Sequence, residues 1–237
     1  MVIEVMELNW DAEGIFRSRP NRFLSIVDII GPEEIKGEMV HVHDPGRLKE
    51  LLYPGNRILL KKAFGKKRKT KWDVIAARFE NEWILIHSGY HRAISERILR
   101  GNNNPLGPLK DIRPEVTVGH SRLDFVCKDE FDTVIGVEVK GCTLAVDGVA
   151  LFPDAPTKRG RKHLETLMEM KASGNRAALM ILIFRHEARC FSPNEETDPR
   201  FTETFRSAME AGVEVHPVVF RYDGVNVSYL GTVPVCE

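Results

Sequence analysis

Glutamine is absent from the whole chain of 237 residues, although asparagine is present. Loss of thermolabile amides is typical of heat-adapted proteins, but the retained asparagine keeps that signal weak. No apolar run approaches the ~20 residues that span a bilayer. The N-terminus carries Glu4 and Glu7 and lacks the basic region of a signal peptide. The sequence therefore predicts a cytoplasmic protein that does not contact membranes.

Cysteine is scarce, and the sequence lacks both the C-x-x-C pairs of zinc sites and the glycine-rich loops that bind phosphate. We expect four reduced thiols, with no disulfide framework and no cysteine zinc site, because no C-x-x-C pair occurs among Cys127, Cys142, Cys190 and Cys236. No Walker-type or G-x-G-x-x-G phosphate loop is present. Lys plus Arg number 34, as do Asp plus Glu. This balance excludes a histone-like polycation but leaves room for local basic patches.

Composition and pattern predict a soluble protein with two domains. Hydrophobic residues make up 43% and charged residues 29%, which is ordinary for a globular chain. A β-rich first half gives way to an alternating α/β half near residues 88–92. We therefore expect one domain over 1–88 and a second over 89–237. The fold class expected is α/β (α+β).

The first half contains short apolar runs bounded by Gly, Pro or Asn, which indicate strands over 22–30, 38–43, 56–64, 71–79 and 83–87. One helix is predicted over Gly46–Tyr53, since its leucines recur at helical spacing. Short strands with one interposed helix are typical of a partly open OB-fold barrel.

The second half predicts a mixed sheet with helices on its faces. Helices are expected over 91–100, 158–172 and 201–211. Strands or extended segments are expected over 115–118, 121–128, 133–140, 143–151, 177–184 and 213–220. The run 177–184 is apolar throughout, as in a strand covered on both faces.

Three charged residues in this half are spaced for chemistry. Glu138 and Lys140 are two apart in a predicted strand, so they share a face while Val139 points back. Asp124 stands in the preceding strand, and a hairpin over 128–132 would bring the two strands together. We expect Asp124, Glu138 and Lys140 to converge at one edge of the sheet.

Two carboxylates at this spacing suit a hard divalent cation, Mg²⁺ with Mn²⁺ as the alternative, and the Val139 carbonyl is a further candidate ligand. Such a cation activates a bound water, and a nearby lysine offsets the charge that develops on the phosphoryl group, so the set suits phosphodiester hydrolysis. Glu96 and Glu115 are supplementary catalytic candidates. The alternative is that Glu138 and Lys140 lie on a solvated strand face with a cross-strand ion pair, which is the usual role of an E-x-K pattern.

Two basic clusters are candidate nucleic-acid contacts. One is a predicted hairpin tip in which cations interleave with aromatics, a pattern that suits phosphate neutralisation and base stacking; it includes Lys66, Lys67, Arg68, Lys69, Lys71 and Trp72. The other begins the helix at 158, where cations oppose the helix dipole unless a phosphate joins them; it includes Arg159, Lys162 and His163. Each could instead be an exposed charged surface.

His41 and His43 share a strand face as H-x-H. A zinc pair needs further ligands, and the sequence identifies no third one.

Several short blocks of the sequence form a distinctive set: Arg22-Phe23-Leu24, His41 through Gly46-Arg47-Leu48, Lys67-Arg68-Lys69-Thr70, Glu115 with Gly119, Ser121 through Phe125, Val137 through Lys140, Phe152 through Thr157, Arg159-Gly160 and Lys162-His163-Leu164. Together these blocks resemble the sugar fermentation stimulation protein A (SfsA) family over almost the full chain.

The resemblance implies an N-terminal OB-fold, a C-terminal domain like the PD-(D/E)xK nucleases, and non-specific DNA binding with a role in regulating sugar-utilisation genes. It places Asp124, Glu138 and Lys140 on the nuclease-like signature, and it adds Arg47, which stands in a matching block, to the candidate nucleic-acid contacts. One block departs from the family's His-Cys-x-Asn-Thr-Gly, because Asp44 replaces an amide and Pro45 a hydroxyl. A carboxylate there would repel phosphate.

Two functions stay open at this point. The first is a Mg²⁺-dependent nuclease that acts on DNA or RNA through Asp124, Glu138 and Lys140. The second is a non-catalytic, DNA-binding regulator that holds nucleic acid through the 61–71 cluster and the OB-like half. Loss of cleavage in Asp124→Ala with binding retained would favour the first.

Overall fold

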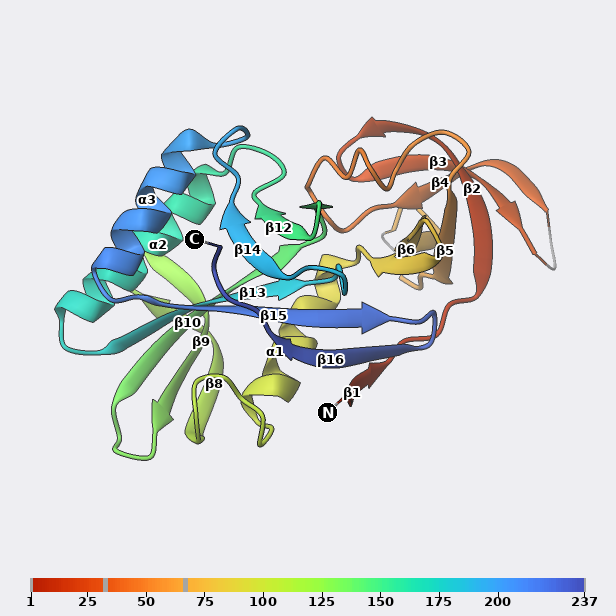
Figure 1. Ribbon diagram of the computed structural model, residues 1–237. Helices are drawn as coiled ribbons and strands as arrows, with labels where there is room; N and C mark the ends of the chain where they lie inside the picture. Colours follow the sequence, from red (N-terminus) through yellow and green to blue (C-terminus); the bar gives the residue numbers. More distant parts are fainter. Residues whose placement is uncertain (1, 32–33, 66–67, 237) are drawn as a thin grey trace. The chain divides into compact units, whose positions relative to one another are not determined.

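The computed structural model describes residues 2–31, 34–65 and 68–236 (Figure 1). Its contacts group the chain into two units. The first comprises Met1–Tyr90 with Phe220–Tyr229, and the second comprises His91–Val219 with Leu230–Glu237. A segment near the C-terminus thus belongs to the first unit, whereas the expected ranges 1–88 and 89–237 place it in the second domain.

The first unit is built around an OB-fold barrel. Neighbouring strands run in the order β4-β3-β2-β5-β6, and a parallel contact between His41 and Asp73 joins β4 to β6. This contact closes the barrel. Strand β7 extends the path beyond β6, and β1 pairs with β16. The bounds are β1 Ile3–Glu7, β2 Ala12–Asn21, β3 Leu24–Ile30, β4 Ile35–His41, β5 Arg57–Lys62, β6 Trp72–Phe79, β7 Glu82–Leu85, the 3-10 helix η1 Ser88–Tyr90 and β16 Asn226–Thr232.

Alternating burial along β2 shows why these residues form a barrel strand. Ala12 and Phe16 are buried while Glu13 and Ile15 are more exposed, as expected of a strand with one face on a core. Gly14 lies between them where β2 and β3 approach closely. A Cβ added there would overlap Val27 Cγ1 and lie 3.2 Å from the Asp28 carbonyl oxygen. Only glycine fits this contact.

The helix predicted over Gly46–Tyr53 is wrong, because this segment forms turns. Leu48 has a φ of 50°, which ends any helix at that point. The Arg19 guanidinium holds the loop instead, donating to the carbonyls of Asp44 at 2.9 Å and of Gly46 and Arg47 at 2.8 Å. The leucines are nevertheless buried. Their helical spacing therefore reflected core positions on a turn.

The second unit is a mixed sheet in the order β15-β13-β10-β9-β8. The pairs β8–β9 and β9–β10 are antiparallel, whereas β10–β13 and β13–β15 are parallel. A small second sheet runs β11-β12-β14. The bounds are α1 His91–Leu99, β8 Leu109–Val118, β9 Ser121–Asp129, β10 Val134–Cys142, β11 Ala145–Val146, β12 Val149–Phe152, α2 Lys158–Ala172, β13 Arg176–Ile183, β14 Cys190–Pro193, α3 Pro199–Glu210 and β15 Glu214–Tyr222.

Helices cover both faces of β10. Helices α2 and α3 lie side by side in Figure 1 and share a core with alternate residues of β13. A Cβ added to Gly136 would overlap Met170 of α2, whereas one added to Gly141 would overlap His91 of α1. Because these two glycines are five apart in one strand, they face opposite sides. The sheet interior explains the continuous apolar run in β13.

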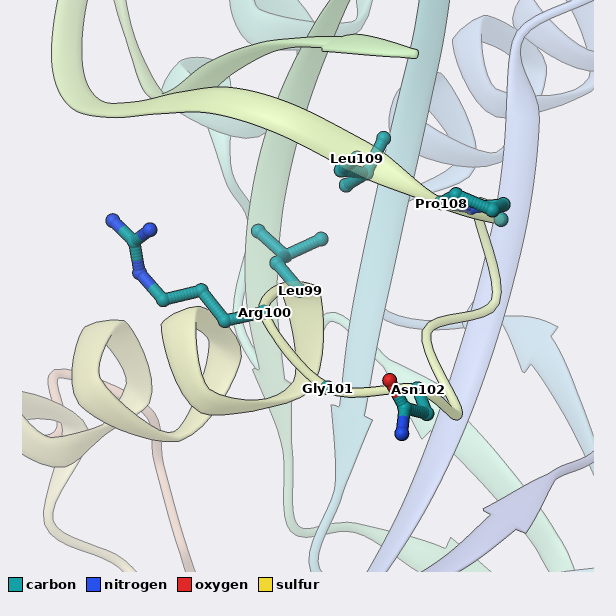
Figure 2. A pocket seen from close by; sticks show the side chains of 7 residues that line it. Leu99, Arg100, Gly101, Asn102, Pro108 and Leu109 are labelled. Carbon is teal, nitrogen blue, oxygen red and sulfur yellow. The ribbon is translucent and has the colours of Figure 1, made fainter. Parts of the chain in front are cut away.

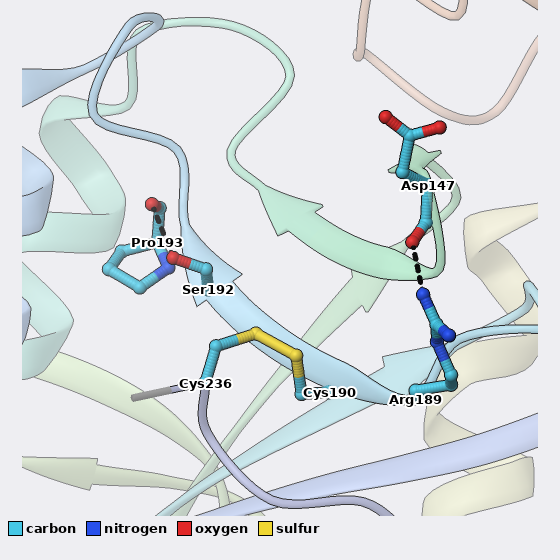
Figure 3. Close-up of a disulfide and its surroundings, with 6 residues drawn as sticks. All are labelled: Asp147, Arg189, Cys190, Ser192, Pro193 and Cys236. Carbon is cyan, nitrogen blue, oxygen red and sulfur yellow. Dashed lines mark hydrogen bonds between the residues drawn. A yellow bond between two sulfur atoms is a disulfide. The ribbon is translucent and has the colours of Figure 1, made fainter.

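The expectation of four reduced cysteines is wrong for one pair. Cys190 on β14 and Cys236 form a disulfide with Cα atoms 5.2 Å apart (Figure 3). The C-terminal segment runs beside β14, because the Cys236 amide donates a hydrogen bond to the Phe191 carbonyl at 2.7 Å. Cys127 and Cys142 are free and buried. Within the described ranges, no helix has the length and apolar character that a membrane crossing requires.

Candidate active site

The three residues singled out for chemistry converge where β9 and β10 separate. Regular pairing between the strands ends at Val137 and Phe125. Just beyond, the Val139 amide donates to Asp124 Oδ2 at 2.7 Å, so that the carboxylate occupies the position of a strand partner. Glu138 and Lys140 are two apart on β10 and share a face, and the Lys140 ammonium contacts Glu138 Oε1. The two-residue period of a strand accounts for the shared face of Glu138 and Lys140.

His163 of α2 completes the group. Its Nδ1 contacts Glu138 Oε1 and lies 3.2 Å from Lys140 Nζ, while its Nε2 accepts a hydrogen bond from Arg159 Nε at 3.3 Å. Because Nε2 accepts this hydrogen bond, the neutral form of the ring has its N–H at Nδ1, and this N–H donates a hydrogen bond to Glu138. Sequence reasoning assigned His163 to nucleic-acid contact, but the ring is buried beside the carboxylate.

The electrostatics of the two carboxylates differ. Burial raises the pKa of Asp124 above its usual value, and the negative charge of Glu138 raises it further. Burial acts in the same direction on Glu138, but the His163 hydrogen bond and the Lys140 charge outweigh it and hold that pKa below its usual value. The surroundings thus favour the anionic form of Glu138 and disfavour that of Asp124.

The donor set fits a hard divalent cation. Glu138 Oε2 is buried and has no hydrogen-bond partner among the described residues, although Oε1 has two. An orphaned carboxylate oxygen beside a second carboxylate is costly unless a cation joins it. Asp124, Glu138 and the Val139 carbonyl supply only oxygen, which is the ligand type of Mg²⁺ and Ca²⁺.

Neither supplementary glutamate joins this group in the described interactions. Glu96 pairs with Arg92 on its own helix, α1, and with Arg100 just after the helix ends. Glu115 is exposed and pairs with Arg122 across the β8–β9 ladder at 3.4 Å. Both are engaged in surface ion pairs, which is the ordinary use of such residues.

The start of α2 is capped by the protein itself. The Thr157 side chain accepts from Gly160 N at 3.0 Å, and Arg161 pairs with buried Asp198 at 3.0 Å. The Gly160 amide is therefore already satisfied and is not free for a phosphate. Lys162 and the body of Arg159 stay exposed, so this end of the helix offers cations rather than backbone donors.

The basic segment of the first unit is placed in part. Lys66 and Lys67 lie outside the described residues. Lys69 and Lys71 are exposed, and Arg68 pairs with Asp73. Trp72 was expected to stack on bases, but its ring is 8% exposed in the barrel, with Lys62 Nζ 5.6 Å from the ring centroid.

The exposed aromatic of this segment is Phe64, at 88%. Arg47 is also exposed at the side chain, and its carbonyl is held by Arg19.

A hollow at the end of α1 contains none of the candidate residues (Figure 2). It is lined by Leu99, Arg100, Gly101, Asn102, Gly107, Pro108 and Leu109. Its one charged side chain, Arg100, is bound to Glu96. The hollow therefore adds no chemistry to the site.

An OB-fold barrel followed by a mixed sheet with helices on its faces is the class of protein that this fold defines. The chain belongs to the sugar fermentation stimulation protein family. The model of the SfsA N-terminal OB domain matches residues 18–86, and that of the sugar fermentation stimulation protein RE domain matches residues 89–226.

Relatives match over nearly the whole chain. The sugar fermentation stimulation protein homolog of Methanococcoides burtonii is 49% identical, covering 98% of this chain and 95% of that protein. The homolog of Sulfurisphaera tokodaii is 47% identical, covering 95% and 90%. The structure of Pyrococcus furiosus SfsA in complex with Ca²⁺ is 27% identical, with a TM-score of 0.88, and covers 99% of this chain and 100% of that one.

Proposed function

We propose that this protein binds nucleic acid, in first place DNA, and hydrolyses its phosphodiester bonds with Mg²⁺ at Asp124, Glu138 and Lys140. The observation that carries the proposal is the buried Glu138 carboxylate, which has one oxygen held by Lys140 and His163 and the other without a partner. A solvated ion pair, the alternative interpretation of E-x-K, would not be buried in this way.

The cation is proposed from the donor chemistry. Asp124, Glu138 and the Val139 carbonyl would hold it, and the Ca²⁺ complex of the Pyrococcus furiosus relative supports a divalent site in this family. Mg²⁺ would supply an activated water and would offset charge on the phosphoryl oxygens. Mn²⁺ has similar ligand preferences and is expected to replace it.

The protein's own groups have separate tasks. Lys140 is the ammonium available to position a water or to neutralise developing phosphoryl charge. His163 fixes Glu138 from the second helix and is itself oriented by Arg159. Because Lys140 contacts both Glu138 and His163, a change in either of these two side chains is expected to disturb the position of Lys140.

Nucleic-acid binding is proposed for the exposed basic segment of the first unit. Lys69, Lys71 and the exposed ring of Phe64 combine cations with a stacking surface. Arg68 and Trp72 are expected to contribute less, because one is paired with Asp73 and the other is buried.

The test is cleavage of labelled single-stranded DNA, duplex DNA and RNA with Mg²⁺, Mn²⁺ or EDTA. Wild type, Asp124→Ala and Lys140→Ala are compared with the control Lys110→Ala, whose exposed lysine pairs with Asp132 on the same sheet. We expect metal-dependent cleavage that both site variants lose and the control keeps. Binding without cleavage of any substrate would instead favour the DNA-binding regulator.

A further inference from the structure

A second group of potential metal ligands lies in the first unit. His43 follows β4, Asp73 lies on β6 and His87 follows β7. One ligand atom from each lies within 4.8 Å of the other two. The group stands at the contact between His41 and Asp73 that closes the barrel. Three separate elements therefore bring two imidazoles and a carboxylate to one point.

The carboxylate is oriented by two different partners. Asp73 Oδ1 is bound by the Arg68 guanidinium, and Oδ2 lies 3.3 Å from His43 Nε2. His43 Nε2 is buried and makes no aligned hydrogen bond in the described part of the chain. An outer partner that fixes a carboxylate while leaving one oxygen directed at an imidazole is the usual support of a metal ligand.

The two imidazoles are also held in place by their surroundings. Their rings stack with centroids 3.8 Å apart, and the Ser88 hydroxyl donates to the His43 carbonyl at 2.8 Å. A Cβ added to Gly89 would lie 2.8 Å from His87 Cε1. Glycine at this position therefore gives the His87 ring the space that it occupies.

We propose that His43, Asp73 and His87 form a zinc site in the barrel. Two imidazoles and one carboxylate are a ligand set that zinc takes readily, whereas Mg²⁺ and Ca²⁺ prefer oxygen alone. Zinc is four-coordinate in most such sites, which leaves one position for water or another ligand. The bound ion would tie the end of β4 to β6 and to the segment after β7.

This site gives the H-x-H motif a specific interpretation. His41 and His43 do not act as a pair, since the rings meet edge to face with centroids 4.4 Å apart and only His43 belongs to the group. The missing ligands are 30 and 44 residues further along the chain, at Asp73 and His87. Arg68 opposes the ion by its charge, so we expect affinity below that of an arginine-free site.

The experiment titrates chelator-treated full-length protein with Zn²⁺ against a chromogenic chelator. We expect one Zn²⁺ per chain at the barrel, with affinity at least about 100-fold weaker in His43→Gln and Asp73→Asn. Gly89→Ala, which keeps every ligand but displaces the His87 ring, is expected to weaken binding as well. Zinc at the barrel is expected to be unchanged in His120→Gln, an exposed histidine, and in Asp124→Asn.

Circular dichroism in EDTA checks that each variant folds. X-ray absorption of the zinc complex of Glu138→Gln, which removes the acidic site and keeps the barrel ligands, gives a readout independent of the barrel variants. Two imidazoles in the first shell would support the proposal. A shell of oxygen alone, or zinc affinity that His43→Gln and Asp73→Asn leave unchanged, would overturn it and leave His43–Asp73 as an ion pair.

Discussion

His163 and Glu138 are predicted to be coupled strongly in folding, independently of any activity. The perturbation is a double-mutant cycle of His163→Gln and Glu138→Gln. It is run in EDTA, so that no divalent cation contributes. Each glutamine is close in size to the side chain it replaces, and the imidazole–carboxylate contact is lost in both single variants.

The magnitude follows from burial. The Glu138 side chain is 2% exposed and that of His163 is 7% exposed, so water cannot replace the lost partner. A hydrogen bond to a charged group contributes about 1.5–3 kcal/mol, and Lys140 still contacts the same oxygen. We therefore expect His163→Gln to cost about 2 kcal/mol with Glu138 present. The cost should fall below about 1 kcal/mol with Gln at that position, because the carboxylate no longer needs a donor.

The assay is urea unfolding of the four proteins at pH 7. A second cycle on Glu214 and His216 is the matched control, since this pair lies 3.2 Å apart but its side chains are 29% and 20% exposed. Its coupling should be about 0.5 kcal/mol because solvent screens it. A His163–Glu138 coupling no larger than that of the control would refute the claim that the buried carboxylate depends on His163.

Three further predictions test other parts of the account. Replacing Cys190 and Cys236 by serine opens a loop of 46 residues and should lower the free energy of unfolding by about 2–4 kcal/mol; unchanged unfolding under reducing and oxidising conditions would count against the bridge. The hydrogen bond with His216, aided by the Arg176 guanidinium, lowers the pKa of Glu214 to about 2 from its usual 4.5. A depressed folded-state pKa stabilises above about pH 4.5 and the effect is lost toward pH 2, so Glu214→Gln should cost about 1–2 kcal/mol at pH 7, discounted for exposure, and nothing near pH 2 in acid unfolding. Lys69→Ala with Lys71→Ala should flatten the log–log salt dependence of duplex binding by about 2, and an unchanged slope would remove them from the interface.

The arrangement of the two strands at the candidate site could be predicted from sequence because it is local. Asp124, Glu138 and Lys140 lie on two strands joined by a short turn, so a two-residue period fixes which side chains share a face. His163 was misassigned because it stands within a basic run. A signal was present, since His163, Leu164, Leu167 and Met170 follow the buried face of α2.

The errors in the first unit have a tertiary origin. Trp72 precedes Val74 and Ala76 on the buried face of β6, a period that predicts burial, yet its neighbouring lysines suggested exposure. The loop at Leu48 is held by Arg19, nearly thirty residues earlier, which no local pattern reveals. Strands β1, β2, β14 and β16 were not predicted, and the disulfide joins cysteines whose spacing matches no motif.

The central claim is that the acidic site cleaves nucleic acid and does not merely hold it. The most direct measurement is binding and cleavage of one labelled DNA by wild type and Lys140→Met, with binding in EDTA and cleavage after Mg²⁺ is added. The account predicts equal binding, with cleavage by wild type at least about 100-fold faster. Equal cleavage by both proteins, or none by wild type while DNA is bound, would contradict it.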